Sequence, residues 1–288
     1  MKNSVAAKGA MAQRQSEGIV GRPDFGNLAL RLRSVLIFAP PVFAAIYFGS
    51  PWFDAIVVIA GLLMLWEWAN LCSDGEFSLL GWLMEAGLAV CLLSIYVSQP
   101  VVSVTLIAAA TGLVVGIAGV RRHQDPARLA LGVLLVGAFC VAFLLLRAIP
   151  GAGRDLTIWL VLAVWFTDAG GYFFGVTIGG PKLAPRISPR KTWAGLGGGV
   201  LLAVIWSSVW LSWICGREII LVLAAAVCVA VLAQLGDLSV SAVKRRFGVK
   251  DSSGLIPGHG GVLDRLDGML FTAPAAAFVL VLSDKGLI

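Results

Sequence analysis

The chain has 288 residues, of which 59% are hydrophobic and 13% charged, and its formal net charge is +6 at pH 7. A soluble domain has no interior large enough to bury that much apolar surface, so the composition excludes a soluble protein and predicts an integral membrane protein. Unpaired backbone groups are too costly in lipid, so the spans must be helices and the fold class is all-α.

Apolar stretches recur along the chain at lengths near the roughly 20 residues that a helix needs to cross the hydrocarbon. They predict a polytopic bundle of about nine transmembrane helices, at about 34–49, 51–71, 78–98, 100–120, 127–148, 156–178, 193–215, 218–238 and 265–283. We divide the chain into a flexible cytoplasmic tail at 1–30, an N-terminal transmembrane scaffold at 31–150 and a C-terminal transmembrane region at 151–288. The last region carries most of the charge within spans, so we expect the chemistry there.

The basic residues orient the bundle, because Lys and Arg are retained in cytoplasmic loops. With a cytoplasmic N-terminus, the 22 Lys and Arg residues all fall on the inside except Arg147, Arg154, Arg217 and Lys285. This asymmetry predicts a cytoplasmic N-terminus. It also accounts for the positive charge, since basic loops facing anionic lipid require no nucleic-acid partner.

Two acids lie within spans of the first half. Glu67 sits between Trp66 and Trp68 near the inner end of the second span, and Glu85 lies in the third. Burying a carboxylate in a membrane helix is costly, so such an acid is a functional candidate. The alternative for Glu67 is that it reaches the interface from a position close to the helix end. The roles of both acids stay open.

Four aspartates of the second half lie toward the cytoplasmic ends of their spans: Asp168, Asp237, Asp264 and Asp267. Asp264 and Asp267 are three residues apart, so a helix projects them from nearly the same face. Carboxylates so close together in a low dielectric favour a divalent cation with hard oxygen ligands between them, which predicts a Mg²⁺ site. The alternative is neutralisation by ion pairs to Lys244, Arg245 and Arg265.

Residues next to these aspartates could bind phosphate. If the helix continues past Asp237, Ser241 and Lys244 lie on the same stripe, where a metal-bound phosphate would reach all three. The loop at 252–261 then offers a glycine-rich nest of backbone amides before a helix N-terminus, an arrangement that favours phosphate oxygens. The alternative is a tight re-entrant turn, which would use the same residues. The nest ends in His259, Gly260 and Gly261.

A second basic loop, at 179–195, leads into the seventh span. Ser188, Lys191 and Thr192 present two hydroxyls and an ammonium near the start of that span, a set that suits a polyphosphate tail or a lipid phosphate. The alternative is an interfacial basic anchor in which Trp193 is an aromatic belt residue.

In one long signature the chain resembles the phosphatidate cytidylyltransferases, also called CDP-diglyceride synthases. The signature reads Ser241-x-Val243-Lys244-Arg245, then Lys250-Asp251-x-Ser253, then Ile256-Pro257-x-His259-Gly260-Gly261-Val262-x-Asp264-Arg265-Leu266-Asp267. The resemblance extends upstream through ISPRKTW at 187–193 and DAGGYFFG at 168–175, and it covers about residues 30–285.

The resemblance implies the Mg²⁺-dependent reaction CTP + phosphatidate → CDP-diacylglycerol + diphosphate, in phospholipid biosynthesis at the cytoplasmic face of the cell inner membrane. It implies that the catalytic residues are Asp237, Lys244, Arg245 and Asp264. The implied metal ligands are Asp237, Asp264 and Asp267, with Asp168 and Asp251 as further candidates. The implied substrate-binding residues are Ser188, Lys191, Thr192, Ser241, Lys250, His259, Gly260, Gly261 and Arg265. A second, monovalent cation and a homodimer are compatible with this scheme.

The chain departs from the family pattern at Gly171, Val176, Pro181 and Ala194. These positions lie outside the signature, so the departures concern substrate binding around 170–195 and not the type of reaction. Two other functions remain as alternatives: another membrane lipid nucleotidyl- or phosphotransferase, and a cation-coupled transporter, which predicts inverted internal repeats.

Overall fold

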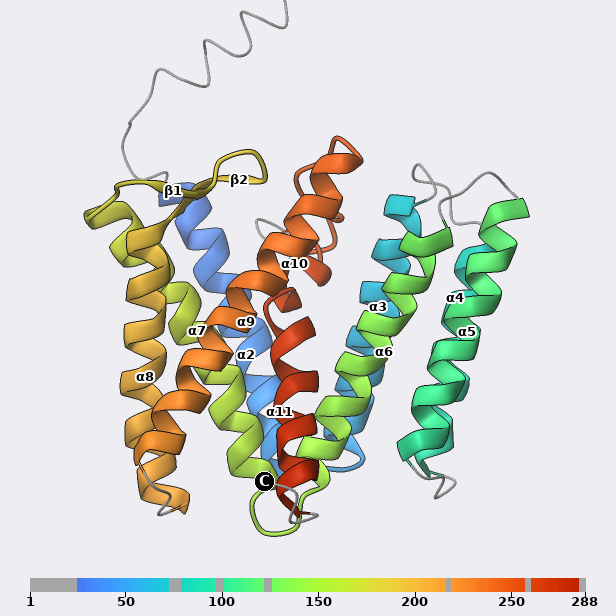
Figure 1. Cartoon of the computed structure of the whole chain (residues 1–288), viewed down its shortest axis with the longest axis horizontal. Coiled ribbons are helices and arrows are strands. Elements are labelled where there is room, and N and C mark those ends of the chain that lie inside the picture. The colour runs from blue at the N-terminus through green and yellow to red at the C-terminus, as the bar shows by residue number, and fades with distance from the viewer. Residues whose placement is uncertain are drawn as a thin grey trace, which may run out of the picture.

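The computed structural model describes residues 25–72, 79–96, 101–121, 126–215, 219–256 and 260–284. The described chain is mostly helical, and its long helices run side by side in one bundle (Figure 1). They are α2 (Phe25–Phe48), α3 (Trp52–Cys72), α4 (Leu79–Tyr96), α5 (Val101–Arg121), α6 (Pro126–Ala148), α7 (Gly153–Thr177), α8 (Trp193–Cys215), α9 (Ile219–Arg246) and α11 (Met269–Asp284). The short helix α10 (Leu263–Leu266) precedes α11.

Five of these helices, α3, α6, α7, α8 and α9, are long and apolar enough to cross a membrane. The other four long helices contain shorter apolar stretches, at Leu36–Phe48, Gly81–Leu93, Thr105–Val120 and Met269–Leu280. Large apolar side chains such as Trp52, Leu113 and Ile220 lie exposed on the bundle, as expected where the surrounding solvent is lipid. The predicted polytopic helical bundle is therefore confirmed, while the number of spans and their direction stay predictions.

Two predicted boundaries are corrected by the structure. Helix α2 begins at Phe25, so residues 25–30, which we assigned to the flexible tail, are helical; residues 1–24 lie outside the described residues. Helix α9 does continue past the predicted span end at 238, as the stripe of Asp237, Ser241 and Lys244 requires, and it ends at Arg246 before Gly248 adopts a φ of +70°. A glycine in this left-handed conformation is a common helix stop. The predicted start of the ninth span at 265 is instead the end of α10, and α11 begins at Met269.

Glycines let the helices approach closely where the acidic residues lie. A Cβ on Gly170 of α7 would overlap the backbone of Gly198 in α8, and a Cβ on Gly236 of α9 would overlap the carbonyl oxygen of Asp267. Small residues at such crossings allow backbone contact, which is a recurrent way to pack helices in membranes. The second of these contacts brings Asp237 next to the link between α10 and α11.

The segment between α7 and α8, which we predicted as a basic loop, contains two short strands, and the rest of the described chain is mostly helical. The segment forms an antiparallel hairpin of β1 (Lys182–Ala184) and β2 (Ser188–Thr192), with Lys182 opposite Thr192 and Ala184 opposite Ser188. The turn places Pro185 at its second position and is closed by the Ile187 amide, which donates to the Ala184 carbonyl at 3.2 Å. Strands this short and this polar carry almost no periodic signal.

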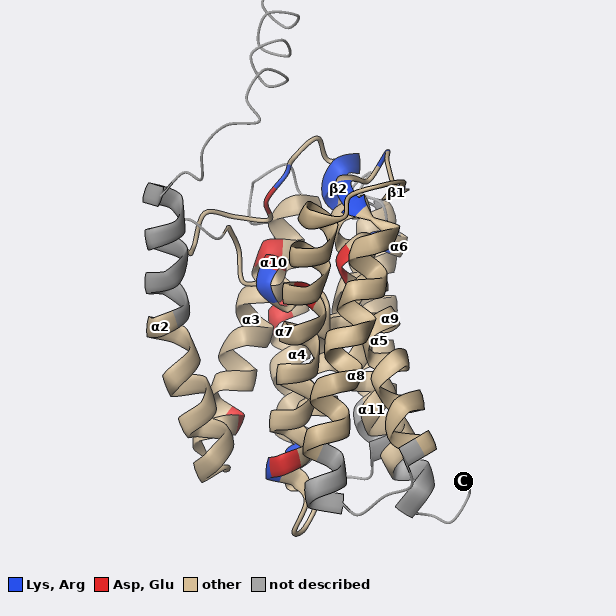
Figure 2. Cartoon of the chain, turned by 90° about the vertical axis from the view of Figure 1, so that its left-hand side faces the viewer, with Lys and Arg blue, Asp and Glu red and all other residues tan. Residues whose placement is uncertain are grey.

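The hairpin, the end of α9 and α10 lie at the same end of the bundle (Figure 1). Figure 2 shows that Lys and Arg residues gather there close to Asp and Glu residues. The main buried core runs below them and joins α3, α6, α7 and α11 through side chains such as Trp68, Phe139, Leu160 and Leu270. The core thus holds elements from both halves of the chain in fixed positions beneath the charged end.

Candidate active site

Two groups of polar side chains occupy the charged end of the bundle. The first, which we call the helix-end cluster, comprises Asp168 of α7, Lys191 of β2, Asp267 after α10, and the α9 residues Gln234, Asp237 and Ser241. The second, which we call the loop clasp, joins α3 and α9 to the loop between α9 and α10. Its members are Glu67, Lys244, Ser252, Ser253, Gly261, Val262, Leu263 and Asp264.

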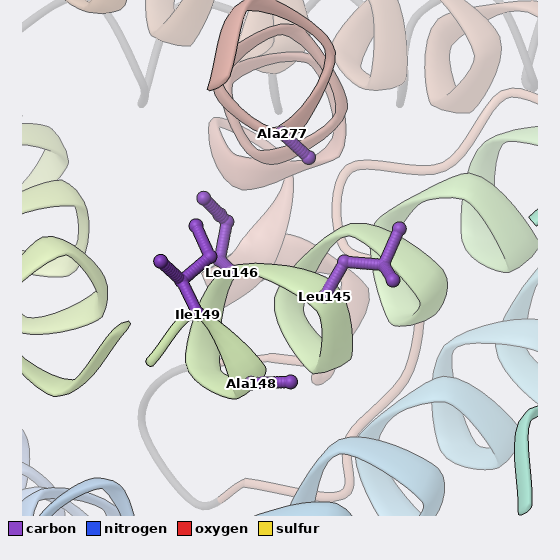
Figure 3. Close-up of a pocket in the computed structure, with 5 residues that line it drawn as sticks. All are labelled: Leu145, Leu146, Ala148, Ile149 and Ala277. Carbon is purple, nitrogen blue, oxygen red and sulfur yellow. The ribbon is translucent and has the colours of Figure 1, made fainter. Parts of the chain in front are cut away.

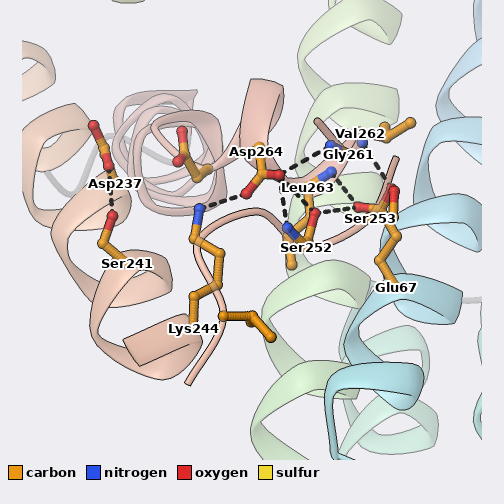
Figure 4. Close-up of polar contacts among 12 residues, drawn as sticks. Glu67, Asp237, Ser241, Lys244, Ser252, Ser253, Gly261, Val262, Leu263 and Asp264 are labelled. Atoms are coloured by element: carbon orange, nitrogen blue, oxygen red, sulfur yellow. Dashed lines mark hydrogen bonds and ion pairs between the residues drawn. The ribbon is translucent and has the colours of Figure 1, made fainter. Parts of the chain in front are cut away.

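The helix-end cluster is organised by Asp237. The Ser241 hydroxyl donates to Asp237 Oδ1 at 3.1 Å, one helical turn along α9 (Figure 4). Lys191 Nζ lies 2.6 Å from Asp237 Oδ2 and donates to Gln234 Oε1 at 2.9 Å. The predicted stripe on a continuing helix is therefore observed, and the basic hairpin reaches it through Lys191.

Two more carboxylates adjoin Asp237. Asp237 and Asp168 both repel the Asp267 carboxylate. Asp168 is likewise repelled by Asp237, and it is attracted by Lys191 and Arg265. Carboxylates that repel one another and are only half-buried, as Asp237 and Asp267 are, suit a hard cation such as Mg²⁺. The donor chemistry of this cluster fits the ion that we predict.

The predicted three-ligand set is divided between the two groups. Asp237 and Asp267 lie in the helix-end cluster, but Asp264 lies in the loop clasp. Among the residues that the structure describes, no three His, Cys, Asp or Glu side chains form a ready-made metal cluster. The metal ligands therefore stay a prediction, and the ion pair that we gave as the alternative is present for Asp264.

Asp264 forms a buried ion pair with Lys244 (Figure 4). Lys244 Nζ donates to Asp264 Oδ1, while Oδ2 accepts hydrogen bonds from the Ser252 amide at 2.8 Å and the Gly261 amide at 2.9 Å, and the Ser252 hydroxyl lies 3.0 Å away. Burial by itself raises the pKa of Asp264, but the hydrogen bonds from Lys244, Gly261 and Ser252 together outweigh burial and lower that pKa below its ordinary value. Both oxygens of Asp264 are thus engaged within the protein.

Glu67 is the second carboxylate of the loop clasp, and it is fully buried. Its Oε1 accepts hydrogen bonds from the Ser253 hydroxyl at 2.6 Å and the Val262 amide at 2.9 Å. Its Oε2 accepts from the Ser252 hydroxyl and the Leu263 amide, both at 2.8 Å. The Glu67 side chain does not extend to the membrane interface. It accepts hydrogen bonds from residues 252–263, about 190 positions further along the chain.

The glycines of the predicted phosphate nest serve these internal contacts. Gly260 has a φ of +83° and pairs with Ile256, its amide donating to the Ile256 carbonyl at 3.1 Å. A Cβ on Gly261 would lie 2.5 Å from each Glu67 oxygen and would overlap the Ser252 hydroxyl. Direct phosphate binding by these amides stays a prediction. His259 lies outside the described residues.

The other predicted residues surround the two groups. Arg245 is exposed and donates to the Ile187 carbonyl at 3.4 Å and the Val249 carbonyl at 3.1 Å, which ties the hairpin to the end of α9. Thr192 is buried, and its hydroxyl accepts a hydrogen bond from the Gly195 amide at 3.0 Å, so it caps α8. Ser188 is half-buried in β2. The exposed members are Lys250, Asp251 and Arg265.

The four departures from the family pattern lie around the hairpin. A Cβ on Gly171 would be 3.7 Å from Gln234 Nε2, an ordinary contact, and Val176 is exposed. The Pro181 carbonyl accepts a hydrogen bond from the Trp193 amide at 3.1 Å, and Ala194 is half-buried in the first turn of α8. The described contacts of the helix-end cluster therefore do not depend on these four side chains.

A separate apolar cavity of about 250 Å³ lies between the C-terminal part of α6 and α11 (Figure 3). Its lining consists of Leu145, Leu146, Ala148, Ile149 and Ala277. These side chains offer no group that could bind a phosphate or a cation.

Comparison with known proteins agrees with the signature. Residues 29–283 match a model described as the cytidylyltransferase family. The chain is 33% identical over 252 residues to the phosphatidate cytidylyltransferase of Brucella suis biovar 1 (strain 1330), which covers 86% of this chain and 91% of that protein. It is 29% identical over 275 residues to the phosphatidate cytidylyltransferase of Rickettsia bellii (strain RML369-C), which covers 93% and 96% respectively.

A further relative matches a smaller part of the chain. The phosphatidate cytidylyltransferase of Bacillus subtilis (strain 168) is 37% identical over 156 residues, which cover 54% of this chain and 58% of that protein. The resemblance predicted from the signature is confirmed by these matches.

Proposed function

Because the chain belongs to the cytidylyltransferase family, we propose that it transfers the cytidylyl group of CTP to phosphatidate, forming CDP-diacylglycerol and diphosphate. The observation that carries the proposal is the meeting of Lys191, Asp237, Lys244 and Asp264, from three separate segments, at one end of a membrane-type bundle. A nucleotidyl transfer between a soluble triphosphate and a lipid phosphate needs such a charged site at the edge of a bilayer.

The reaction is an in-line displacement at phosphorus. An oxygen of the lipid phosphate attacks the α-phosphorus of CTP, and the bond from that phosphorus to the bridging oxygen breaks, so that diphosphate leaves with the electron pair. No residue needs to form a covalent intermediate. Lys191 and Arg245 lie where they would neutralise the phosphates that gather there, and Ser241 offers a hydroxyl beside them.

We assign Mg²⁺ to the helix-end cluster, with Asp237 and Asp267 as its carboxylate ligands and Asp168 beside them. A bound Mg²⁺ would neutralise the triphosphate and polarise the reacting phosphorus. Proteins commonly hold this ion by one or two carboxylates together with substrate phosphates, so a ready-made group of three is unnecessary. Asp237 also has protein partners, Lys191 and the Ser241 hydroxyl, but its side chain is 30% exposed. Asp264 is different because its side chain is only 3% exposed and its oxygens are engaged by Lys244 and by the Ser252 and Gly261 amides. We propose that Asp264 positions Lys244 and the loop between α9 and α10.

The membrane arrangement in this proposal has nine spans, a cytoplasmic N-terminus and the charged end facing the cytoplasm, in the cell inner membrane. Two features support it. The basic segments 182–191 and 244–246 lie at the same end of the bundle (Figure 1), and that end also receives the signature loop. Lys and Arg are retained on the cytoplasmic side, where CTP is available.

The test is a reconstitution assay with the purified chain in detergent or lipid. With CTP, phosphatidate and Mg²⁺ present, CDP-diacylglycerol and diphosphate should form in equal amounts, and chelation of divalent cations should stop the reaction. Parallel assays with other phospholipid acceptors separate this function from other lipid nucleotidyltransferases. A folded protein that makes no product from CTP and phosphatidate would overturn the proposal, and undiminished turnover after chelation would overturn the metal assignment.

A further inference from the structure

We propose that Glu67, in the N-terminal half, is a positioning residue for the reaction: it ties the loop between α9 and α10 to the start of α10 and so fixes the positions of Lys244 and Asp264. This inference rests on the proposed function, because it names what the loop serves. It assigns a role to an acid that lies on α3, far in sequence from the signature.

Four hydrogen bonds carry the assignment, and their donors lie about ten residues apart along the chain. Ser252 and Ser253 lie inside the loop at 247–262, Val262 is its last residue and Leu263 is the first residue of α10 (Figure 4). Within the described residues, Val262 at the N-terminal end of α10 has no side-chain cap of its own. Glu67 therefore closes the loop and supplies the missing acceptor for two free amides of that helix.

The loop clasp connects Glu67 to the charged groups through Ser252. The Ser252 hydroxyl lies 2.8 Å from Glu67 Oε2 and 3.0 Å from Asp264 Oδ2, and it has a single proton for these two acceptors. Asp264 in turn forms the ion pair with Lys244. A change at Glu67 thus reaches Lys244 through two intervening residues, Ser252 and Asp264, although Glu67 itself does not touch the helix-end cluster.

The geometry requires a carboxylate at this position. Each oxygen of Glu67 accepts one backbone N–H, Oε1 from Val262 and Oε2 from Leu263. A serine hydroxyl can rotate and become an acceptor, but a backbone N–H can only donate. In either orientation of its side-chain amide, a glutamine here would place its NH₂ donor against one of the two backbone N–H donors, and that hydrogen bond would be lost. Its size would fit, yet its hydrogen bonding would not.

Two substitutions test this requirement in opposite ways. Glu67→Gln keeps the size and removes an acceptor, whereas Glu67→Asp keeps both acceptor oxygens and shortens the side chain. We expect Glu67→Gln to lower kcat/KM for cytidylyl transfer by about 10- to 100-fold, the usual cost of losing a supporting contact around a reactive group. We expect Glu67→Asp to retain more activity than Glu67→Gln. A residue that only filled space would give the opposite order.

A second readout follows the loop directly. In hydrogen exchange, the amides of Val262 and Leu263 should lose protection in Glu67→Gln relative to the wild-type protein. The matched control is Glu85→Gln, which alters the other acid of the N-terminal spans. Glu85 lies on α4, and its Oε1 has no hydrogen-bond partner within the described residues, so activity and loop protection should stay at wild-type values.

The outcomes separate this inference from the proposed function. If the wild-type chain makes no CDP-diacylglycerol, the proposed function fails whatever Glu67 does. If the wild-type is active and Glu67→Gln is as active, or more active than Glu67→Asp, the positioning role fails. Should Glu67→Gln not fold, Ser253→Ala decides, because it removes one donor from Oε1 and leaves Glu67 in place. A loss of about threefold or more supports the role, and wild-type activity overturns it.

Discussion

The helix-end cluster and the loop clasp lie at the same end of the bundle but treat charge in opposite ways. In the helix-end cluster, Asp237 and Asp267 are half-buried carboxylates that repel each other. In the loop clasp, the oxygens of Glu67 and Asp264 are buried and matched by donors of the protein. The helix-end cluster has three carboxylates and one ammonium, that of Lys191, so negative charge is left for a cation. In the loop clasp, hydrogen bonds and one ion pair use the carboxylates to hold the backbone. We therefore expect substitutions in the first group to change activity alone, and substitutions in the second to change stability as well.

The largest expected effect is that of Asp264→Asn. The substitution leaves the buried Lys244 ammonium without its counter-charge and turns an NH₂ group toward donors such as the Gly261 amide. Turnover should be abolished, and the free energy of unfolding should fall by about 3–5 kcal/mol, as when one partner of a buried ion pair is removed. Product formation and denaturant unfolding measure the two effects. Unchanged stability would show that the clasp is not balanced in the way described.

Asp237→Asn should separate activity from stability. The substitution removes a carboxylate that we assign to Mg²⁺ and the counter-charge of Lys191, which keeps its hydrogen bond to Gln234. We expect turnover to fall by about 100-fold or more, the scale of losing one preorganised charge at a reacting phosphate. The midpoint of thermal unfolding should stay close to the wild-type value. The assay is CDP-diacylglycerol formation over a Mg²⁺ titration, and a loss of stability equal to that of Asp264→Asn would contradict the comparison.

Gly261→Ala tests how closely the clasp is packed. A methyl group there would lie 2.5 Å from both Glu67 oxygens, so the loop must move away from α3. We expect unfolding to become easier by about 1–3 kcal/mol, the usual cost of overpacking. Turnover should fall as well, because the loop carries the amides that hold Asp264.

The matched control for Gly261→Ala is Gly254→Ala in the same loop. Within the described residues, a Cβ at Gly254 would meet no atom within 4 Å. Its stability should therefore change by less than about 0.5 kcal/mol. Equal effects of the two substitutions would mean that the loop is not held by Glu67 and Asp264.

Much of the helix-end cluster could be predicted from the sequence, because its geometry is local. The 3.6-residue period places Asp237, Ser241 and Lys244 on one stripe once the helix continues, and α9 does continue to Arg246. Composition likewise predicts a helical membrane bundle. The hairpin could not be predicted, since its strands have three and five residues without an alternating pattern.

The loop clasp shows where sequence reasoning ends. The acid between two tryptophans marked Glu67 as unusual, but its partners lie 185 to 196 positions along the chain. Nothing local specifies that contact, which depends on how α3 packs against α10. The same holds for Asp264, because whether a carboxylate meets a metal or Lys244 depends on the distance between α9 and α10.

The smallest expected effect on stability is that of Lys191→Ala. The ion pair between Lys191 and Asp237 is partly exposed, with 18% and 30% of the two side chains accessible. Such pairs contribute little, so the free energy of unfolding should change by less than about 1 kcal/mol. Turnover should nevertheless fall by about tenfold or more, because Lys191 supplies a charged donor that we assign to substrate phosphate.

Arg190→Ala is the matched control for Lys191→Ala, because neighbouring residues of a strand point to opposite faces and Arg190 is exposed. It should retain wild-type turnover within about twofold, since an exposed surface change away from the cluster has a small effect. If Lys191→Ala lost stability but kept activity, Lys191 would be a structural contact like Lys244. The helix-end cluster would then be a second clasp, and the charge available for substrate would have to lie elsewhere.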